Sequence, residues 1–316
     1  MFIATHRKLF FWITGLIMAA AIAAIVVYGL PLGIDFTGGS LMQVSFREGR
    51  PALSEVQKEV ASVPLGSVSV RESGTDAVTI RTRTMTPAEH DAVLAAISGN
   101  ASTTLNGAGA PSGEQPKAAI AELSYTSVGP ALGSQFANKA LWAILAVALA
   151  IILFIAFAFR KVSRPVPSSM YGLTVIVILV HDLIIPAGFF AILAHFTGAE
   201  VDALFVTALL ALLGYSVNDT IIIFDRVREH LATNEKTGTK EEFETTVGKS
   251  ISETLTRSIN TSFTVVLALL ALVYFGASAT RTFALVLLVG VVAGTYSSIL
   301  LAAPLLVPFA KYFTKK

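Results

Sequence analysis

The stretch GYSVNDTIIIFDRVREH, residues 214–230, places a carboxylic acid inside an apolar helix. Asp219 follows an apolar run that begins at residue 201 and contains only a few small polar side chains. The run ends in Asp225 and Arg226, and such a charged ending is typical of a membrane–water interface. A helix rises about 1.5 Å per residue, so Asp219 lies roughly 10 Å inward of Arg226. An ionised carboxylate at that depth is costly unless it faces protein, water or a partner.

Two interpretations of Asp219 follow from this position. In the first, Asp219 is a functional group, because ionisable residues inside membrane helices are rare and usually mark ion or substrate pathways. In the second, Asp219 only hydrogen-bonds to neighbouring helices, with Ser216, Asn218 and Thr220 as further polar contacts. The rarity of such residues favours the first interpretation.

The composition identifies the class of protein. Of the 316 residues, 54% are hydrophobic and only 14% are charged, whereas about 25% are charged in a soluble domain. The chain is therefore an integral membrane protein. The net charge is +2 and no basic cluster is interleaved with aromatic residues, which argues against nucleic-acid binding. The absence of cysteine excludes disulfides, thiolate catalysis and cysteine metal sites.

Six hydrophobic stretches are long enough to cross a bilayer, which takes about 20 residues. They cover residues 9–30, 141–159, 170–194, 201–224, 256–275 and 282–309. The first stretch resembles the start of a secretory signal, but its run of about 22 apolar residues exceeds the roughly 7–15 of a signal, so we expect an uncleaved helix. Basic residues beside the helix ends, such as Arg7, Lys8, Arg160, Lys161 and Lys311, predict that both termini lie in the cytoplasm.

The predicted architecture is an α-helical membrane protein with one external domain. The first membrane helix occupies residues 1–30, the external domain 31–138 and a five-helix membrane bundle 139–316. Within the bundle, residues 225–257 are predicted to form a charged, helix-prone cytoplasmic loop, and their mixed charges are typical of a solvated amphipathic linker.

The external domain shows alternating strand and helix patterns. Alternation predicts strands and 3.6-residue spacing predicts helices, in the order of residues 41–46, 52–63, 67–73, 77–84, 87–97 and 119–128. The helix over 87–97 is opened by Thr86 as N-cap and by Pro87. A Gly/Ser/Pro-rich linker, 99–116, precedes the last strand. The order βαββαβ predicts a ferredoxin-like α+β domain between membrane helices one and two.

Further polar residues interrupt the other membrane helices. His181 and Asp182 lie near the middle of the third helix. Arg257, Asn260, Thr261 and Thr264 share one face of the fifth helix, and we expect this face to turn toward the bundle. In the sixth helix, the spacing of Gly290 and Gly294 predicts close helix packing.

Asp182, Asp219 and Arg257 place ionisable groups in three successive helices. Burial disfavours a charged carboxylate and a nearby cation favours it, so a small movement of Arg257 relative to Asp219 changes the proton affinity. We therefore predict a proton pathway through these residues, with His181, Asn218, Asn260 and Thr261 as supporting polar groups. Two alternatives stay open: Asp182 is locally satisfied by His181, and Arg257 extends to the interface.

Enzymatic functions have little support. GYSVND differs from the GxGD pattern of intramembrane aspartyl proteases, and the chain has neither a P-loop nor an HExxH motif. We therefore predict no enzymatic activity, no bound metal and no cofactor other than protons. The segment LGIDFTGGS, 32–40, follows the first helix; Asp35 is suited to capping local amides, and Gly38 and Gly39 permit positive φ before a strand.

Four motifs together resemble the SecF branch of the SecD/SecF family. They are GIDFTGG after the first helix, HDL in the third, GYSVNDTIIIFDRVRE at the end of the fourth and TRSINTS opening the fifth. The resemblance covers essentially the whole chain, and Phe36-Thr37 and Asn218-Asp219 favour SecF over SecD. It implies a fold similar to the resistance-nodulation-division transporters, with Asp219 and Arg257 as acid and base of the proton pathway. It also implies that residues 35–39 are a family motif.

The resemblance further implies a function and partners. SecD and SecF together use the proton-motive force to complete export of preproteins across the bacterial cytoplasmic membrane, after SecA and the SecYEG channel have begun it. The expected partners are SecD, SecYEG, SecA indirectly, YajC and unfolded preprotein. Two other functions remain open at this stage: half of a proton-coupled small-molecule antiporter, and an assembly subunit without ion chemistry.

Overall fold

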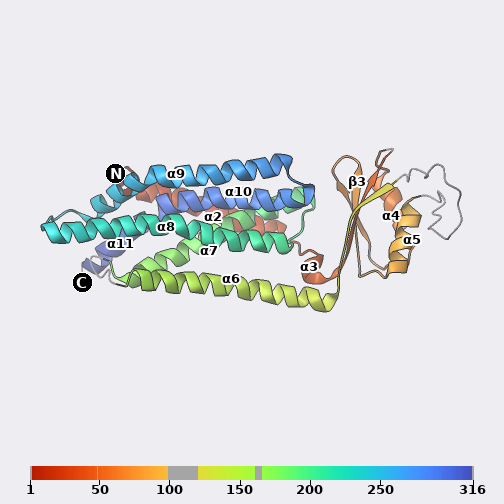
Figure 1. Cartoon of the computed structure of the whole chain (residues 1–316), viewed down its shortest axis with the longest axis horizontal. Helices are drawn as coiled ribbons and strands as arrows, with labels where there is room; N and C mark the ends of the chain where they lie inside the picture. Colours follow the sequence, from red (N-terminus) through yellow and green to blue (C-terminus); the bar gives the residue numbers. More distant parts are fainter. Residues whose placement is uncertain (1, 48, 99–119, 161–165, 315–316) are drawn as a thin grey trace, which may run out of the picture. The chain divides into compact units, whose positions relative to one another are not determined.

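The computed structural model describes residues 2–47, 49–98, 120–160 and 166–314. The chain divides into two compact units, a helical unit formed by Met1–Pro31 and Ala140–Lys316 and a sheet unit formed by Leu32–Lys139 (Figure 1). Each unit has its own hydrophobic core.

Long helices dominate the helical unit. They are α2 (Arg7–Tyr28), α6 (Pro130–Ala158), α7 (Ser168–Thr197), α8 (Ala203–Thr237), α9 (Phe243–Phe275), α10 (Ser278–Ser297) and α11 (Ala303–Thr314), with the short α1 (Phe2–Thr5) and a π-helix, η1 (Ser298–Ala302), between α10 and α11. Within the described ranges, six helices are long and apolar enough to cross a membrane, the last of them made of α10, η1 and α11. The prediction of a mostly helical protein with six candidate membrane helices is confirmed.

The helices extend further than hydropathy predicts. Residues 225–257, expected to be a loop, belong to α8 and α9 except for residues 238–242. The turn begins at Gly238, whose φ of 67° provides the left-handed ending of α8. Hydropathy detects where apolar residues stop, whereas a helix continues into water when polar neighbours pair along it, as Arg226 and Glu229 do.

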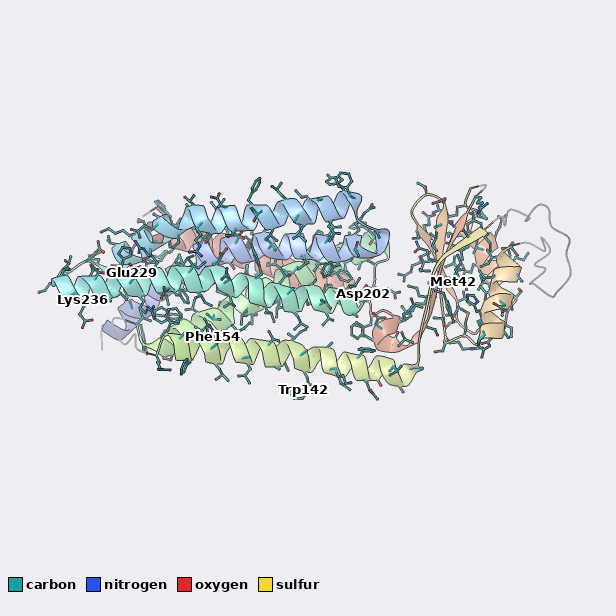
Figure 2. All side chains as sticks on the ribbon, viewed as in Figure 1. Met42, Trp142, Phe154, Asp202, Glu229 and Lys236 are labelled. Atoms are coloured by element: carbon teal, nitrogen blue, oxygen red, sulfur yellow. The ribbon has the colours of Figure 1, made fainter. Side chains whose placement is uncertain are left out.

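The interior of the helical unit lies among α7, α8 and α10. Gly290 and Gly294 of α10 bring it close to α8: an added Cβ would lie 2.1 Å from Cδ1 of Leu212 at Gly290 and 3.0 Å from Cβ of Ser216 at Gly294. The predicted close packing at this pair of glycines is confirmed. By contrast, Trp142 and Phe154 of α6 point outward and are 70% and 57% exposed in the isolated chain (Figure 2).

Within the described residues, the core of the sheet unit is built from four antiparallel strands and two helices. In chain order these are β1 (Gly39–Phe46), α4 (Leu53–Ala61), β2 (Ser69–Ser73), β3 (Ala77–Thr82), α5 (Pro87–Ile97) and β4 (Ile120–Val128). The sheet order is β2-β3-β1-β4, with Met42 of β1 opposite Ile80 of β3. Met42 and Ile80 are buried with Val56 of α4 and Val93 of α5. The predicted linker 99–116 lies outside the described residues.

The glycine-rich segment that precedes β1 forms a short helical turn, α3 (Ile34–Thr37). Asp35 lies within this turn rather than at its N-cap position, which is occupied by Gly33, and Phe36 is buried. Gly38 and Gly39 have φ of 75° and 129°, as the sequence predicts. A Cβ at Gly38 would lie 2.6 Å from Cα of Pro130, so the backbone approaches too closely for a side chain.

Candidate functional site

Asp182 of α7 is buried with all of its polar atoms partnered. Its Oδ1 lies 2.7 Å from Nδ1 of His181, and its Oδ2 accepts hydrogen bonds from Ser216 of α8 and, at 3.1 Å, from Ser297 of α10. His181 Nε2 in turn lies 2.9 Å from the hydroxyl of Tyr296. Both carboxylate oxygens and both imidazole nitrogens therefore have partners, and the network joins α7, α8 and α10. We call these five residues the Asp182 network.

The π-helix η1 begins directly after this network. Ser297 closes α10 and bonds to Asp182, while Ser298 opens η1 and lies 2.8 Å from the hydroxyl of Thr220 on α8. Two successive residues thus contact two different helices. Single π-helical turns of this kind occur frequently at functional sites, because they re-aim side chains within an otherwise regular helix.

Asp219 of α8 is also buried, at 3% exposure, but its environment differs. In the described part of the chain, its Oδ2 has no hydrogen-bond partner, and neither has Oγ of Ser258 on the neighbouring α9. Ser258 and Ser262 of α9 are neighbours of Asp219 with hydrogen-bonding side chains, and Arg257 acts on Asp219 through its charge. Ser262 accepts hydrogen bonds from Tyr215 at 3.0 Å and from Thr295 at 2.7 Å, which leaves its own O–H free to donate to Asp219.

Arg257 does not form an ion pair with Asp219. No Lys, Arg or His nitrogen of the described ranges lies within 4.0 Å of an Asp219 oxygen, and Arg257 is exposed in the isolated chain. The structure therefore places the two residues on facing helices without joining them. Asp219 remains a buried acid without a paired cation.

The expectation that the Arg257 stripe faces the bundle is wrong for this chain by itself. Arg257, Asn260, Thr261 and Thr264 are all exposed, as is Asn218 on α8. The face of α9 that packs inward carries Thr254, Ser258 and Ser262 instead. Adjacent residues of a helix point about 100° apart, so a stripe shifted by one position faces a different neighbour.

Sequence reasoning missed several members of these networks. Ser297 binds Asp182, Tyr296 binds His181, and Ser258 lies beside Asp219. Ser216 is predicted to be a neighbour of Asp219, but it binds Asp182. Hydroxyl residues are common in membrane helices, so their presence alone gives little signal. The i, i+4 spacing of Thr254, Ser258 and Ser262 was the one pattern in the sequence that marked the inward face of α9.

Two family models match the chain. The model described as protein export membrane protein SecD/SecF, C-terminal, matches residues 111–312, and the SecD/SecF GG motif matches residues 23–49. Among curated relatives, the protein translocase subunit SecF of Thermobaculum terrenum is 38% identical over 96% of this chain and 92% of its own length. The corresponding protein of Anaerolinea thermophila is 36% identical over 95% of this chain and 91% of its own length.

A solved structure has a similar fold. It is that of SecDF, a translocon-associated membrane protein from Thermus thermophilus, with a TM-score of 0.78 and 26% identity over 98% of this chain. The chain spans only 38% of the length of that protein.

Proposed function

This chain belongs to the SecD/SecF family of protein export membrane proteins, and on that premise we propose that Asp219 couples the proton-motive force to export. The chain is an accessory subunit of the Sec protein translocase and a multi-pass protein of the bacterial inner membrane. In this function the subunit takes its energy from protons, which are the coupling ion, and it uses no other cofactor.

One observation carries the proposal: Asp219 is buried in a membrane helix with one carboxylate oxygen lacking a partner. A protonated carboxyl fits such a site better than a charged one, and an approaching cation reverses that preference. Arg257 stands on the facing helix and acts on Asp219 without being paired to it. A proton that crosses the membrane is worth about 2.3 kcal/mol per 100 mV, which is sufficient to bias two conformations separated by a few kcal/mol.

Asp182 supports this function in a different way. We predicted it as a second member of the proton pathway, and that assignment stays a prediction. Its complete set of hydrogen-bond partners favours the alternative that it is a satisfied group holding α7, α8 and α10 together.

SecD is the expected partner in the membrane, as the SecDF structure and the family indicate. Asn218, Asn260 and Thr261 are exposed on α8 and α9 in the isolated chain. Polar side chains facing lipid are unfavourable, so this face fits contact with another protein. We place SecD against it. SecYEG, SecA, YajC and the unfolded preprotein complete the proposed assembly.

We propose the membrane topology that the sequence predicts. The chain order βαββαβ and the sheet order β2-β3-β1-β4 support a ferredoxin-like domain for residues 31–138, and we propose that it lies outside the cytoplasmic membrane. In this arrangement both termini and the turn at 238–242 are cytoplasmic. Protonation changes in the helical unit then move the external domain, which holds emerging polypeptide.

The test is export of a secreted reporter from cells that lack the native protein and carry either wild type or Asp219→Asn at matched membrane levels. Asparagine keeps the shape and hydrogen-bonding capacity of the side chain but cannot titrate. We expect export to fall to the level of the null strain while the variant still co-purifies with SecD. The control is Glu235→Gln, an exposed residue of the same helix that loses the same charge. Normal export by Asp219→Asn refutes proton coupling at Asp219 and leaves an assembly role.

A further inference from the structure

A pocket of about 350 Å³ lies between α8 and α9. Five of its seven lining residues are charged, in contrast to the apolar membrane segments on either side of it. The lining residues are Ile222, Asp225, Arg226, Glu229, Glu253, Thr254 and Arg257. A pocket of this volume holds several waters, and its charged walls supply the polar partners that ordered water requires.

The inner end of the pocket is adjacent to Asp219. Ile222 is three residues, about one helical turn, beyond Asp219 on α8, and Thr254 is four residues before Ser258 on α9. Side chains three or four residues apart lie on the same face of a helix. Asp219 Oδ2 and Ser258 Oγ, two buried polar atoms without partners among the described residues, therefore lie about one helical turn inward of Ile222 and Thr254, which line the pocket.

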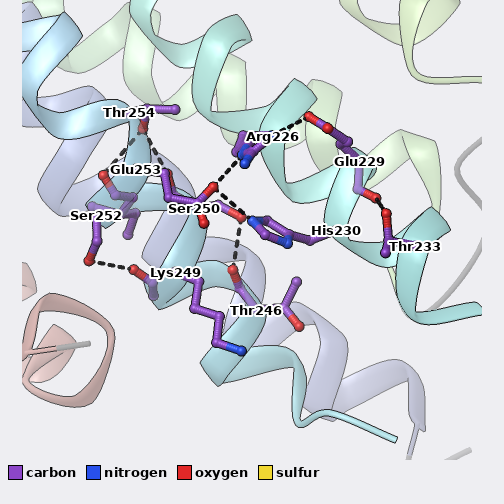
Figure 3. Close-up of polar contacts among 12 residues, drawn as sticks. Arg226, Glu229, His230, Thr233, Thr246, Lys249, Ser250, Ser252, Glu253 and Thr254 are labelled. Atoms are coloured by element: carbon purple, nitrogen blue, oxygen red, sulfur yellow. Dashed lines mark hydrogen bonds and ion pairs between the residues drawn. The ribbon is translucent and has the colours of Figure 1, made fainter. Parts of the chain in front are cut away.

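An ion-pair network joins the two helices at the pocket. Glu253 of α9 pairs with Nε of Arg226 on α8 and lies 3.0 Å from Nε2 of His230, also on α8 (Figure 3). Both of these contacts cross from α8 to α9. Arg226 also pairs with Glu229 at 2.5 Å, and Arg228 pairs with Asp225, within α8.

We propose that this pocket is the aqueous vestibule through which Asp219 exchanges protons, and that the Arg226–Glu253–His230 network is the latch that closes it. Exposed ion pairs are weak, so such a latch opens readily when the ends of α8 and α9 separate. Arg257 lies in the wall of the vestibule and also acts on Asp219, so it connects the two. The inference rests on the proposed proton coupling. The residues of the latch, however, are identified by the contacts of Glu253 with Arg226 and His230.

The absence of cysteine from the chain provides a direct test. Single-cysteine variants Ile222→Cys and Leu213→Cys, expressed with SecD in native membranes, are treated with a membrane-impermeant maleimide on the side of the 238–242 turn. Maleimides react with the thiolate, which requires contact with water. Leu213 lies on the same helix, fully buried in the core, and is the control. We expect Ile222→Cys to react about tenfold faster than Leu213→Cys.

The latch is tested on the Ile222→Cys background. Glu253→Gln removes the negative charge from both pairs of the latch, and we expect it to accelerate labelling by roughly threefold or more, since exposed pairs hold the helix ends weakly. Arg226→Gln removes the pair with Glu253 but leaves Glu253 beside His230, so we expect a smaller acceleration. Glu235→Gln is the matched control, because it removes an exposed carboxylate of α8 that does not line the pocket, and the labelling rate should not change.

The outcomes separate this inference from the proposed function. Labelling of Ile222→Cys no faster than that of Leu213→Cys overturns the vestibule, even if Asp219→Asn abolishes export. Equal labelling with and without both latch substitutions overturns the latch. Rapid labelling together with normal export by Asp219→Asn retains a water-filled pocket and refutes proton coupling at Asp219.

Discussion

Asp182 and Asp219 are both buried acids in membrane helices, yet their surroundings are opposite. Asp182 accepts hydrogen bonds from serines on two other helices and contacts His181, whereas Asp219 keeps one oxygen without a partner. Most buried polar groups in proteins are satisfied, so an unsatisfied one requires an explanation. The two acids are therefore buried to the same extent, and what differs between them is the number of hydrogen-bond partners.

The difference also predicts which acid tolerates substitution. A satisfied network stabilises one arrangement of the helices, and removal of its acceptor leaves several donors without partners. An acid with an unsatisfied oxygen contributes little to stability, so its substitution should cost less than that of a satisfied acid. Four variants or conditions sharpen this contrast, and they follow from the largest expected effect to the smallest.

The largest effect is expected for Asp182→Ala. It leaves the donors Ser216 and Ser297 and the ring of His181 without their acceptor in the core. We expect a loss of about 3–5 kcal/mol in the free energy of unfolding, measured by denaturant titration in detergent micelles. Asp219→Asn should remain within about 1 kcal/mol of wild type in the same assay. Equal destabilisation by the two variants would contradict the contrast between the two acids.

Gly294→Val acts on the Asp182 network through packing. An added Cβ at Gly294 lies 3.0 Å from Cβ of Ser216, and a branched side chain pushes Ser216 away from Asp182. We expect a loss of about 1–3 kcal/mol, typical of an overpacked core. Gly172→Val is the control, since nothing lies within 4 Å of a Cβ at that position. If the Gly294→Val variant were as stable as Gly172→Val, α8 and α10 would be able to move apart without a loss of stability.

A matched pair of serine substitutions separates the two sites more finely. Ser297→Ala removes a donor to Asp182 and should cost about 1–2 kcal/mol of stability. Ser258→Ala removes a buried hydroxyl that has no partner, so its stability should stay within about 0.5 kcal/mol of wild type or rise. Both serines are fully buried, so a difference in burial cannot account for a difference in stability between the two variants. A larger loss for Ser258→Ala would reveal a partner of that hydroxyl.

The smallest effect is expected for Glu89, a partly exposed carboxylate that serves as a reference for the buried Asp182 and Asp219. The hydrogen bond from Arg83 and the capping bonds of Thr86 lower the pKa of Glu89 from 4.5 to about 2. A lowered folded pKa stabilises the sheet unit above pH 4.5, and this contribution disappears as the pH falls toward 2. The protection of α5 amides, taken as their exchange rate relative to the intrinsic rate at each pH, should therefore fall over that range, and Glu89→Gln should remove this pH dependence. An unchanged dependence in Glu89→Gln would assign it to another group.

The sequence predicts the elements well where periodicity and turn chemistry agree. The helix over 87–97 and its cap at Thr86 are found as predicted, because a capping box and Pro87 are local signals. The six apolar spans follow from hydropathy alone. The polar ends of α8 and α9 escaped prediction, since pairs such as Arg226–Glu253 connect residues distant in sequence.

The candidate site is less predictable than the fold. Asp182, Asp219 and Arg257 were identifiable because charged residues are rare in apolar segments. Their partners depend on the rotation of each helix, which a single sequence does not determine. The exposed position of Asn260 and the buried position of Ser258, two residues apart on α9, illustrate how strongly that rotation decides the environment.

Proton-driven export in membrane vesicles tests the central claim most directly. Inverted vesicles containing wild type or Asp219→Asn, each assembled with SecD, are loaded with a partly translocated preprotein, and its completion is followed with and without an imposed proton gradient. We expect the gradient to accelerate completion in wild-type vesicles and to have no effect with Asp219→Asn. Equal acceleration in both would show that Asp219 does not carry the coupling.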